Sequence, residues 1–430
     1  MSATPSIFAI DFGTSNSLLA AADARHIFAP APLDPMASDA TVLRSALYFT
    51  DLAHGVFGAQ ALQRFVENGF RGRLIRSIKR HLPSRSFTLT RVGDKLVTLE
   101  QLIGAFLRAM RERGCTHYGV EVERVVLGRP ARFSNDADED TLAEQRLKRA
   151  AELAGFREVR LCPEPVAAAY DFVDDLAEPR TVLVADLGGG TSDFTLVRMR
   201  RDGFDASDVL AVVGVAVAGD VIDGALVRSR VAPEFGSRTR YRAPFGKNVL
   251  EMSVDLVDLL CSPADLTLVD RNAVLKRIAD IRAGAVDPAI DGPLLDRLHV
   301  VIDDGIGFTL YDSVEAAKRR LSDVEATRFH FDYPGAEVDI AVTRSELEVA
   351  SRRAVAQIAR ALDETLEAGR MRPQDVDILC LTGGTSRMPV VERTLSARLP
   401  NARLRRLRSF HSVVQGLALH ARDVAAFGLP

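Results

Sequence analysis

Two carboxylates flank a run of glycines near the middle of the chain, in the segment VLVADLGGGTSDFTLV that spans residues 182–197. Apolar runs on both sides predict two buried strands, with Asp186 ending the first and Asp193 beginning the second. Glycines in such a turn allow the backbone to take positive φ and to approach a ligand, and a following threonine adds a hydroxyl. The turn residues are Gly188, Gly189, Gly190 and Thr191.

The chemistry that this arrangement suits is the binding of a metal-bound phosphate. Consecutive backbone N–H groups in a glycine turn form a nest for an anion. Two carboxylates beside that nest would repel a phosphate unless a divalent cation lies between them. The segment therefore indicates a Mg²⁺-nucleotide site, and a plain glycine-rich hairpin turn is the alternative.

A second copy of the pattern lies near the amino terminus, where residues 7–20 read IFAIDFGTSNSLLA. Asp11 aligns with Asp186, and apolar runs flank both segments. The turn of this copy carries Gly13, Thr14, Ser15 and Asn16. An internal repeat of this kind predicts two similar half-structures that face one ligand, with Asp11 and Asp186 holding the metal from opposite sides.

Composition and charge restrict the class of protein. A length of 430 residues is enough for about three domains or two large lobes, and the chain is 47% apolar and 26% charged. Its net charge of only −3 favours neither nucleic acid nor an anionic membrane as partner. The four cysteines are scattered without metal-like spacing, as expected for reduced thiols in a cytosolic chain. No signal segment and no membrane helix is expected, because no apolar stretch reaches about 18 residues.

Two further charged residues stand in contexts that suit phosphoryl chemistry. Lys79 lies in the basic stretch RLIRSIKRHLP, and a lysine at a γ-phosphate neutralises charge that develops on the transferring group. Glu164 stands between two prolines before the small-residue run VAAAY, so its carboxylate is fixed on a rigid turn and is a candidate for orienting a water. The alternatives are a solvated surface lysine and a helix-start carboxylate favoured by the dipole.

Three other helices are predicted from their termini. The first begins at the acidic run 136–140 and ends at Gly155, and Arg146, Lys148 and Arg149 towards its end suit the helix dipole. The second, YDSVEAAKRRLSD, is capped by Asp312 or Ser313. The third runs over about 344–368 from a capping box, Thr343 with Glu346, to Gly369.

Polar and glycine residues around two of these later elements form further candidates. One face of the second helix carries, at i, i+3, i+4 and i+7, the residues Glu315, Lys318, Arg319 and Ser322. A solvated face with a Glu-to-Lys or Glu-to-Arg pair is the alternative. Turns after buried strands carry Gly219 and Asp220, then Gly383, Gly384, Thr385 and Arg387. The second of these turns lies at the carboxyl end of a strand, where α/β sheets bind ligands, and a simple tight connection is its alternative.

Taken in order, these segments resemble the nucleotide-binding domain of the seventy-kilodalton heat-shock (DnaK-type) chaperones from residue 7 to about 420. The motifs that carry the resemblance are AIDFGTSNS, SIKRHL, CPEPVAAAY, VADLGGGTSDF, EAAKRRLS and LTGGTSRMP. The resemblance implies an α/β, actin-like ATPase fold of two lobes, each with a βββαβα core and an inserted subdomain, that close on ATP or ADP with Mg²⁺.

The resemblance also implies roles for the candidate residues. Lys79 would lie at the γ-phosphate, with Glu164 as a second water-orienting group, and Asp186 and Thr191 would join them at the catalytic centre. The Mg²⁺ shell would be surrounded, largely through waters, by Asp11, Asp186 and Asp193. The phosphates would be held by Thr14, Ser15, Gly189, Gly190 and Thr191. The face at 315–322 with the turn at 383–387 would hold ribose and adenine.

The expected domains are lobe I at 1–176 with an insert at about 38–115, lobe II at 177–404 with an insert at about 220–342, and a segment 405–430 that packs back on lobe I. Phe410 stands where the family has an aspartate, residues 225–310 show little likeness, and no peptide-binding domain is expected, so the chain looks like a truncated, YegD-type relative.

The expected function is a slow Mg-ATPase, chaperone-like and cytoplasmic, whose nucleotide-dependent lobe closure is read by a separate protein partner. The alternatives are a non-hydrolysing ATP sensor and an actin-like assembly protein.

Overall fold

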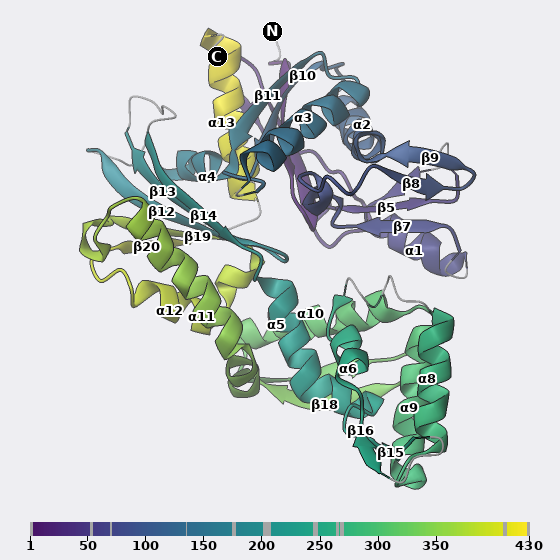
Figure 1. The fold of residues 1–430 in the computed structure, drawn as a ribbon. Coiled ribbons are helices and arrows are strands. Elements are labelled where there is room, and N and C mark those ends of the chain that lie inside the picture. Colours follow the sequence, from purple (N-terminus) through teal and green to yellow (C-terminus); the bar gives the residue numbers. More distant parts are fainter. Residues whose placement is uncertain are drawn as a thin grey trace. The chain divides into compact units, whose positions relative to one another are not determined.

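A computed structural model describes residues 3–51, 55–68, 71–134, 136–173, 178–200, 208–243, 248–263, 266, 271–406 and 411–427 (Figure 1). The chain divides into two compact units. Unit 1 contains Met1–Ala216, Arg360–Ser386 and Leu395–Pro430, and unit 2 contains Val217–Ala359 and Arg387–Thr394. Phe410 lies outside the described residues.

The first sheet of unit 1 has the strand order β11-β10-β1-β2-β3, and β4 also pairs with β2. Strands β1 and β2 form an antiparallel hairpin, whereas β10 runs parallel to β1 and β11 parallel to β10. The strands are β1 (Ile7–Phe12), β2 (Asn16–Ala22), β3 (Ile27–Phe28), β4 (Leu43–Arg44), β10 (Arg124–Arg129) and β11 (Glu158–Pro163). Their apolar runs are buried on both faces, as the sequence pattern predicts.

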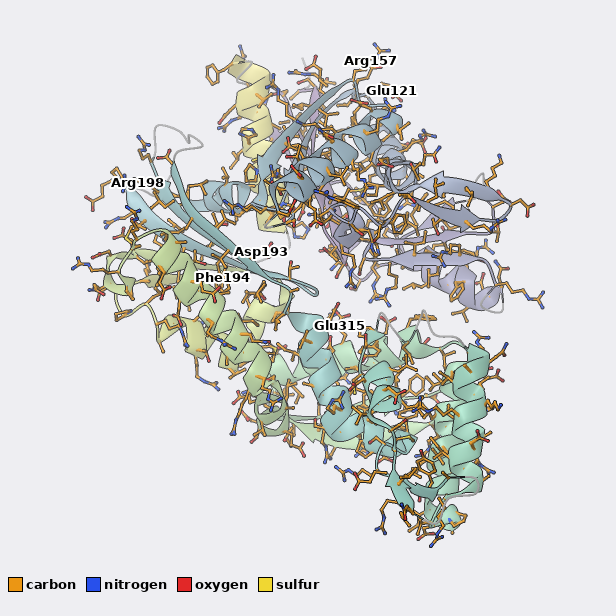
Figure 2. All side chains as sticks on the ribbon, viewed as in Figure 1. Glu121, Arg157, Asp193, Phe194, Arg198 and Glu315 are labelled. Carbon is orange, nitrogen blue, oxygen red and sulfur yellow. The ribbon has the colours of Figure 1, made fainter. Side chains whose placement is uncertain are left out.

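The second sheet of unit 1 repeats this plan, with the strand order β14-β13-β12-β19-β20. Strands β12 and β13 form the antiparallel hairpin, and β19 runs parallel to β12. The strands are β12 (Arg180–Leu187), β13 (Ser192–Met199), β14 (Val209–Val215), β19 (Ile378–Thr382) and β20 (Arg403–Arg406). Asp193 and Arg198 lie towards opposite ends of β13, with Asp193 beside the glycine turn (Figure 2).

One apolar cluster joins the two sheets of unit 1. It contains Ile7 and Ala9 from β1, Val182 and Val184 from β12, and Leu417 from α13 (His411–Phe427). Helix α13 packs on β1, β2 and β10, and also on α4 (Glu164–Val173). The two hairpins are therefore fixed on one continuous core.

Helices α2 (Leu99–Tyr118) and α3 (Ala137–Leu153) lie side by side and cover the other face of the first sheet (Figure 1). A capping box of Thr98 and Gln101 begins α2, and the Asp136 carboxylate accepts the backbone N–H groups of Asp138 and Glu139 at the start of α3. Gly155 follows α3 with φ of 96°, which confirms its expected role as the helix stop.

The segment between the first hairpin and α2 forms small sheets around one helix. Strand order is β6-β5-β7 in one sheet, and β8 and β9 form a separate hairpin. These elements are β5 (Ala46–Phe49), β6 (Gly55–Phe57), α1 (Ala59–Glu67), β7 (Arg73–Arg76), the 3₁₀ turn η1 (Ile78–His81), β8 (Leu89–Val92) and β9 (Lys95–Thr98).

Unit 2 is mainly helical, with two short hairpins. Its elements are α5 (Gly219–Leu226), η3 (Val227–Val231), η4 (Ala232–Phe235), β15 (Arg240–Arg242), β16 (Val249–Glu251), α6 (Val254–Leu260), α8 (Arg271–Ala283), α9 (Pro288–Asp303), α10 (Gly307–Asp323), β17 (Ala326–Phe331) and β18 (Val338–Thr343). Three elements cross between the units along the chain: α11 (Arg344–Ala368), η6 (Gly384–Arg387) and α12 (Pro389–Ser396). The short turn η5 (Pro373–Asp375) precedes β19.

Helix termini in this half of the chain confirm two expectations and correct one. The capping box at α11 is confirmed, because Thr343 N–H donates to Glu346 Oε2 at 2.9 Å and Glu346 N–H donates to Thr343 Oγ1 at 3.3 Å. Helix α10 begins at Gly307 and not at Asp312 or Ser313, because buried Phe308 and Tyr311 extend its apolar face towards the amino terminus. Arg370, with φ of 50°, is the left-handed residue after α11.

Gly369 directly follows the last residue of α11, which confirms the predicted end of this helix. A Cβ at this position would lie 2.5 Å from Leu196 Cδ2, so a larger residue would force that buried side chain to move. None of the helices in the described ranges combines the length and apolarity needed to cross a bilayer. All four cysteines are free thiols.

Candidate functional site

The hairpin registers place three aspartates at the turn ends of their strands. Asp11 is the second-to-last residue of β1 and faces Leu18 on β2. Asp186 occupies the same place on β12, but faces Asp193 on β13. Two carboxylates on directly opposed antiparallel residues repel each other unless a cation or a proton intervenes.

Lys79 and Glu164 form a buried ion pair in the same unit. Lys79 Nζ lies 2.6 Å from Glu164 Oε1, and the two side chains are 8% and 12% exposed. Lys79 is held on η1, and Glu164 begins α4 directly after β11. Gly128 on the neighbouring strand β10 makes room for this carboxylate, because a Cβ there would lie 3.2 Å from Glu164 Cγ. The basic segment around Lys79 is thus not a purely solvated face.

The ionisable groups of the two hairpins and of this ion pair interact strongly. Burial, then Glu164, raises the pKa of Asp11 to about 7, against the opposing effect of Lys79. Burial, then Glu164, Asp193 and Asp11, raises the pKa of Asp186 to about 8. Burial also raises the pKa of Asp193 to about 6, against the hydrogen bond from Thr191. Four carboxyl groups therefore share one lysine.

The same surroundings favour the charged form of Lys79. Burial disfavours its charged form, but the fields of Glu164, Asp11 and Asp186 outweigh burial and raise the pKa of Lys79 above its ordinary value. The cluster consequently carries excess negative charge around a fixed ammonium. A divalent cation would favour the ionised carboxylates and reduce their mutual repulsion.

Direct metal coordination by these carboxylates is incomplete. Across the residues that the structure describes, no three Asp, Glu, His or Cys side chains are arranged to hold a metal ion together. Mg²⁺ keeps several waters and is commonly held by one or two carboxylates together with substrate phosphates. The negative cluster fits a hydrated Mg²⁺ of that kind, and it does not form a closed all-protein site.

Both hairpin turns are supported by a hydroxyl from elsewhere in the chain. Ser45 Oγ donates to the Gly13 carbonyl at 2.7 Å, and Thr385 Oγ1 donates to the Gly188 carbonyl at 2.7 Å. Within the second turn, Gly188 N–H donates to the Thr191 carbonyl at 3.0 Å. Thr191 Oγ1 donates to Asp193 Oδ2 at 2.8 Å, so in this structure its hydroxyl is engaged with the carboxylate.

The expectation that the central glycines adopt positive φ is wrong for Gly188 and Gly190. Neither takes a left-handed φ, and a Cβ on Gly190 would meet nothing within 4 Å. Gly13 is required for a different reason, because a Cβ there would lie 2.1 Å from the Asn16 carbonyl oxygen. The open space at Gly190 leaves the backbone accessible to a ligand, which is the second role expected of these glycines.

The turn after β19 lies against the second hairpin. Gly383 adopts φ of 81°, and a Cβ there would lie 2.3 Å from the Leu187 carbonyl oxygen. Ser386 Oγ donates to the Gly383 carbonyl at 2.7 Å, which closes the turn. Gly384 is exposed, whereas Thr385 is buried and occupied with Gly188. Sequence reasoning treated Thr385 as a nucleoside contact and missed this supporting role.

The predicted residues of unit 2 form a separate charged cluster. Lys318 Nζ on α10 lies 2.7 Å from Asp223 Oδ2 on α5 and 3.3 Å from the Gly219 carbonyl oxygen. Burial raises the pKa of Asp223 to about 6, with Lys318 opposing the rise and Glu315 and Asp220 adding to it. Lys318 is therefore buried between two helices, and Asp223 is a member of the cluster that the sequence reading did not single out.

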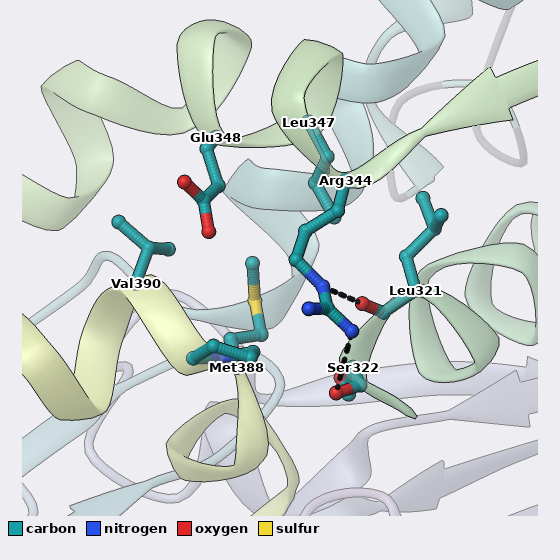
Figure 3. A pocket seen from close by; sticks show the side chains of 8 residues that line it. Leu321, Ser322, Arg344, Leu347, Glu348, Met388 and Val390 are labelled. Carbon is teal, nitrogen blue, oxygen red and sulfur yellow. Dashed lines mark hydrogen bonds between the residues drawn. The ribbon is translucent and has the colours of Figure 1, made fainter. Parts of the chain in front are cut away.

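Ser322 and Arg319 occupy the other part of the predicted face of α10. Arg319 is exposed, and Ser322 lines a small hollow with Arg344 and Glu348 of α11 and with Met388–Val390 (Figure 3). Arg344 fixes the end of α10 by donating to the carbonyls of Leu321 at 2.8 Å and Ser322 at 3.3 Å. Arg387 is exposed at the start of the same segment.

The structure thus brings the expected residues together in two groups, one in each unit. The group in unit 1 consists of Asp11, Gly13, Lys79, Glu164, Asp186, Gly188, Thr191, Asp193, Gly383 and Thr385. The group in unit 2 consists of Gly219, Asp220, Glu315 and Lys318. In the first turn, Thr14 and Asn16 are half-buried and Ser15 is exposed.

Paired hairpins of this type, on two related sheets of a mixed α/β chain, belong to an actin-like ATPase fold. Comparison with protein-family models matches residues 73–239 and 303–423 to the family described as Hsp70 protein. Because this is more than half of the chain, the protein belongs to the Hsp70 family. The resemblance inferred from the sequence motifs is confirmed at this level.

Curated relatives extend the match across nearly the whole chain. The chain is 24% identical over 427 residues to the chaperone protein DnaK of Thermosipho melanesiensis and 25% identical over 428 residues to that of Thermotoga neapolitana. Each alignment covers 97% of this chain and 59% of the relative, so the chain spans about three fifths of their length. The gap in the family match, 240–302, lies within the region 225–310 where little likeness was expected.

Proposed function

We propose that this chain binds Mg-ATP and hydrolyses it slowly, as a chaperone-type ATPase. The observation that carries the proposal is the cluster of three aspartates around the Lys79–Glu164 ion pair, beside two glycine-containing turns. The Hsp70 family binds ATP or ADP with Mg²⁺ in general, which supports this ligand for the cluster.

The residues of unit 1 take distinct roles in this proposal. Lys79 neutralises charge at the γ-phosphate, and Glu164 keeps the ammonium in place and orients water. Asp11, Asp186 and Asp193 attract a hydrated Mg²⁺, which supplies charge neutralisation of the phosphates when bound. Slow turnover is expected, because positioning and electrostatics are available but no activated covalent nucleophile is placed here.

Adenine recognition is proposed for one face of α10 in unit 2. The ribose and base would be held there by Glu315, Lys318, Arg319 and Ser322, together with Arg387 of the same unit, as the family pattern implies. Arg319 is exposed and free to stack on a base, whereas Lys318 is engaged with Asp223 and would act mainly by fixing the helix. Arg319→Ala is expected to weaken ATP binding, while GTP competing as well as ATP against the unaltered chain would contradict this placement.

The decisive experiment measures binding and chemistry separately. Purified protein in excess is mixed with ATP and Mg²⁺, and phosphate release is followed over a single turnover, with calorimetric titration for affinity. Binding together with slow phosphate release supports the proposal. Absence of Mg²⁺-dependent ATP binding would overturn it.

A non-hydrolysing ATP sensor is the second candidate, and one observation favours it. Lys79 Nζ and Glu164 Oε1 are in direct contact at 2.6 Å, so one donor of the ammonium and one carboxylate oxygen are engaged by each other and not by an attacking water. In that case the same experiment gives tight Mg²⁺-dependent binding without phosphate release.

The relatives are named chaperone proteins, and for this chain a protein partner that responds to the nucleotide state is a proposal. We propose with it the division into lobe I at 1–176 and lobe II at 177–404, hinge movement between them, and a cytoplasmic location. Pull-downs from cell extract with ATP and with ADP test the partner, beside a titration with a fluorescent apolar peptide. Capture that differs between the nucleotides supports it, and identical capture or tight peptide binding contradicts it.

A further inference from the structure

Arg146 is a charged residue of α3 whose side chain points into the protein instead of to solvent. Its side chain is 11% exposed, and its guanidinium donates to three backbone carbonyls: Leu82 at 3.0 Å, Ser84 at 2.9 Å and Phe87 at 3.1 Å. The His81 carbonyl lies further away, at 3.5 Å. The planar guanidinium of an arginine presents its N–H donors in fixed directions and can therefore bind several carbonyls at once. A lysine ammonium does not offer this arrangement of donors.

A carboxylate on the neighbouring helix holds this guanidinium in turn. Arg146 Nε lies 3.3 Å from Glu100 Oε1 on α2, and Glu100 is 22% exposed. The other cations of α3 behave differently: Lys148 and Arg149 are more exposed and pair with acidic residues on their own helix. Arg146 is also too far from the last turn of α3 to serve the helix dipole, contrary to the sequence interpretation.

The segment to which Arg146 donates its hydrogen bonds contains Lys79. Leu82 N–H donates to the Lys79 carbonyl and Ser84 N–H to the His81 carbonyl, each at 3.1 Å. The rings of His81 and Phe87 close the segment, with centroids 5.1 Å apart. Residues 78–87 therefore form one compact segment, and Arg146 holds three of its backbone carbonyl groups.

The backbone immediately before residues 78–87 is strained. Ser77 adopts φ of 52° and ψ of 35°, a left-handed conformation that a residue other than glycine, Asn or Asp seldom takes. Such a conformation persists only where the surroundings over-determine it. The hydrogen bonds to Arg146 supply a restraint on the other side of Lys79.

We propose that Arg146 is a positioning residue for Lys79. It holds residues 78–87 in the shape that keeps the Lys79 ammonium beside Glu164 and the aspartates, and so sets the rate of hydrolysis without contacting the nucleotide. The inference rests on the proposed ATPase function. Small displacements of a catalytic group are costly, since a misplacement of about 1 Å reduces rates by about 100-fold.

The experiment compares Arg146→Ala and Arg146→Lys with Arg149→Ala as a matched control from the same helix. Single-turnover phosphate release is expected to fall on the order of 10- to 100-fold for Arg146→Ala and less for Arg146→Lys, with ATP affinity nearly unchanged. Arg149→Ala should match the unaltered chain. Unchanged rates in both Arg146 variants, or equal losses of affinity and rate, would overturn the inference.

A combined variant separates positioning from general destabilisation. Adding Arg146→Ala to Lys79→Ala should lower the rate no further, because Arg146 acts through Lys79. A further large loss in the combined variant would mean that Arg146 acts elsewhere, and would count against the inference.

Amide hydrogen exchange tests the restraint even if the chain hydrolyses no ATP. Faster exchange confined to residues 78–87 in Arg146→Lys supports the restraint, and unchanged exchange there refutes it. Absence of hydrolysis in the unaltered chain, with the exchange effect present, would reject the proposed ATPase activity and leave the structural role of Arg146 standing.

Discussion

The two hairpins of unit 1 share one backbone device but differ in charge. Each begins with an aspartate one residue before the end of its first strand, and each has a turn glycine whose carbonyl accepts a 2.7 Å hydrogen bond from a distant hydroxyl. Ser45 provides this bond for Gly13, and Thr385 provides it for Gly188. The repeat therefore extends beyond the sequence motif to the way in which the turns are held.

The difference lies in the residue opposite each aspartate. Asp11 faces Leu18, whereas Asp186 faces Asp193, whose charge adds to the rise in the pKa of Asp186. Repetition fixes the geometry of the turns, and this asymmetry concentrates negative charge on the second hairpin. The second hairpin is consequently the stronger candidate for attracting a cation.

Removal of the one cation shared by both hairpins should have the largest effect. Lys79→Ala is expected to slow single-turnover phosphate release by about 100- to 1,000-fold, because a preorganised group at the developing charge is lost. ATP binding should survive. Arg80→Ala, an exposed neighbour on η1, is the control. If Lys79→Ala released phosphate at the normal rate, Lys79 would not act at the γ-phosphate.

The charge asymmetry predicts unequal effects on metal dependence. Asp186→Asn should weaken Mg²⁺-dependent ATP binding more than Asp11→Asn, within the range of about 10- to 100-fold typical of residues around a metal shell. Calorimetric ATP titrations with Mg²⁺ and with EDTA measure the difference, and exposed Asp94→Asn is the control. Equal effects of the two substitutions would contradict the predicted asymmetry between the hairpins. ATP affinity of the unaltered chain that is the same with Mg²⁺ and with EDTA would contradict the metal role of both aspartates.

The shared turn device predicts equal effects of its two hydroxyls. Thr385→Val and Ser45→Ala each remove one neutral hydrogen bond, which contributes about 1 kcal/mol, so each should weaken nucleotide binding by about fivefold. Ser45→Ala should also lower stability, because Ser45 Oγ contacts Ser17 Oγ at 3.0 Å. Loss of ATP affinity in only one of the two variants would show that nucleotide binding depends on the hydroxyl at one turn and not on the hydroxyl at the other.

The smallest effect concerns pH and stability without metal. Because the pKa of Asp186 is raised to about 8, the native state holds its proton where the unfolded chain has lost it. The free energy of unfolding therefore falls between about pH 4 and pH 8 as this group ionises, and Asp186→Asn escapes the loss. In EDTA, the melting temperature of Asp186→Asn relative to the unaltered chain should rise by several degrees from pH 5 to pH 8.

Excess Mg²⁺ should close that gap, because a bound cation favours the ionised carboxylate. A melting-temperature difference that stays constant from pH 5 to pH 8 would show that Asp186 ionises normally. Differential scanning calorimetry at both pH values, with and without Mg²⁺, provides the measurement.

Local patterns in the sequence determined the two hairpins, the family and several helix termini. A strand, an aspartate and a glycine turn are contiguous, so Asp11, Asp186 and Asp193 were found without knowledge of the fold. The capping box of Thr343 and Glu346 is equally local. Where local signals competed, at the start of α10, the continued burial of Phe308 and Tyr311 prevailed over the polar cap residues.

Tertiary structure alone decided which distant side chains meet. Thr385 and Gly188 are separated by 197 residues and Lys79 and Glu164 by 85, and no period or motif gives the direction of a side chain across such a distance. Lys318 belongs to a polar helix face in the sequence, yet it is buried against Asp223 because α5 packs there. Arg146 looked like a dipole-compensating residue until the carbonyls of residues 82–87 came within its reach. Composition and spacing specify the groups that are available for chemistry, whereas long-range packing sets the partners that determine their charge and position.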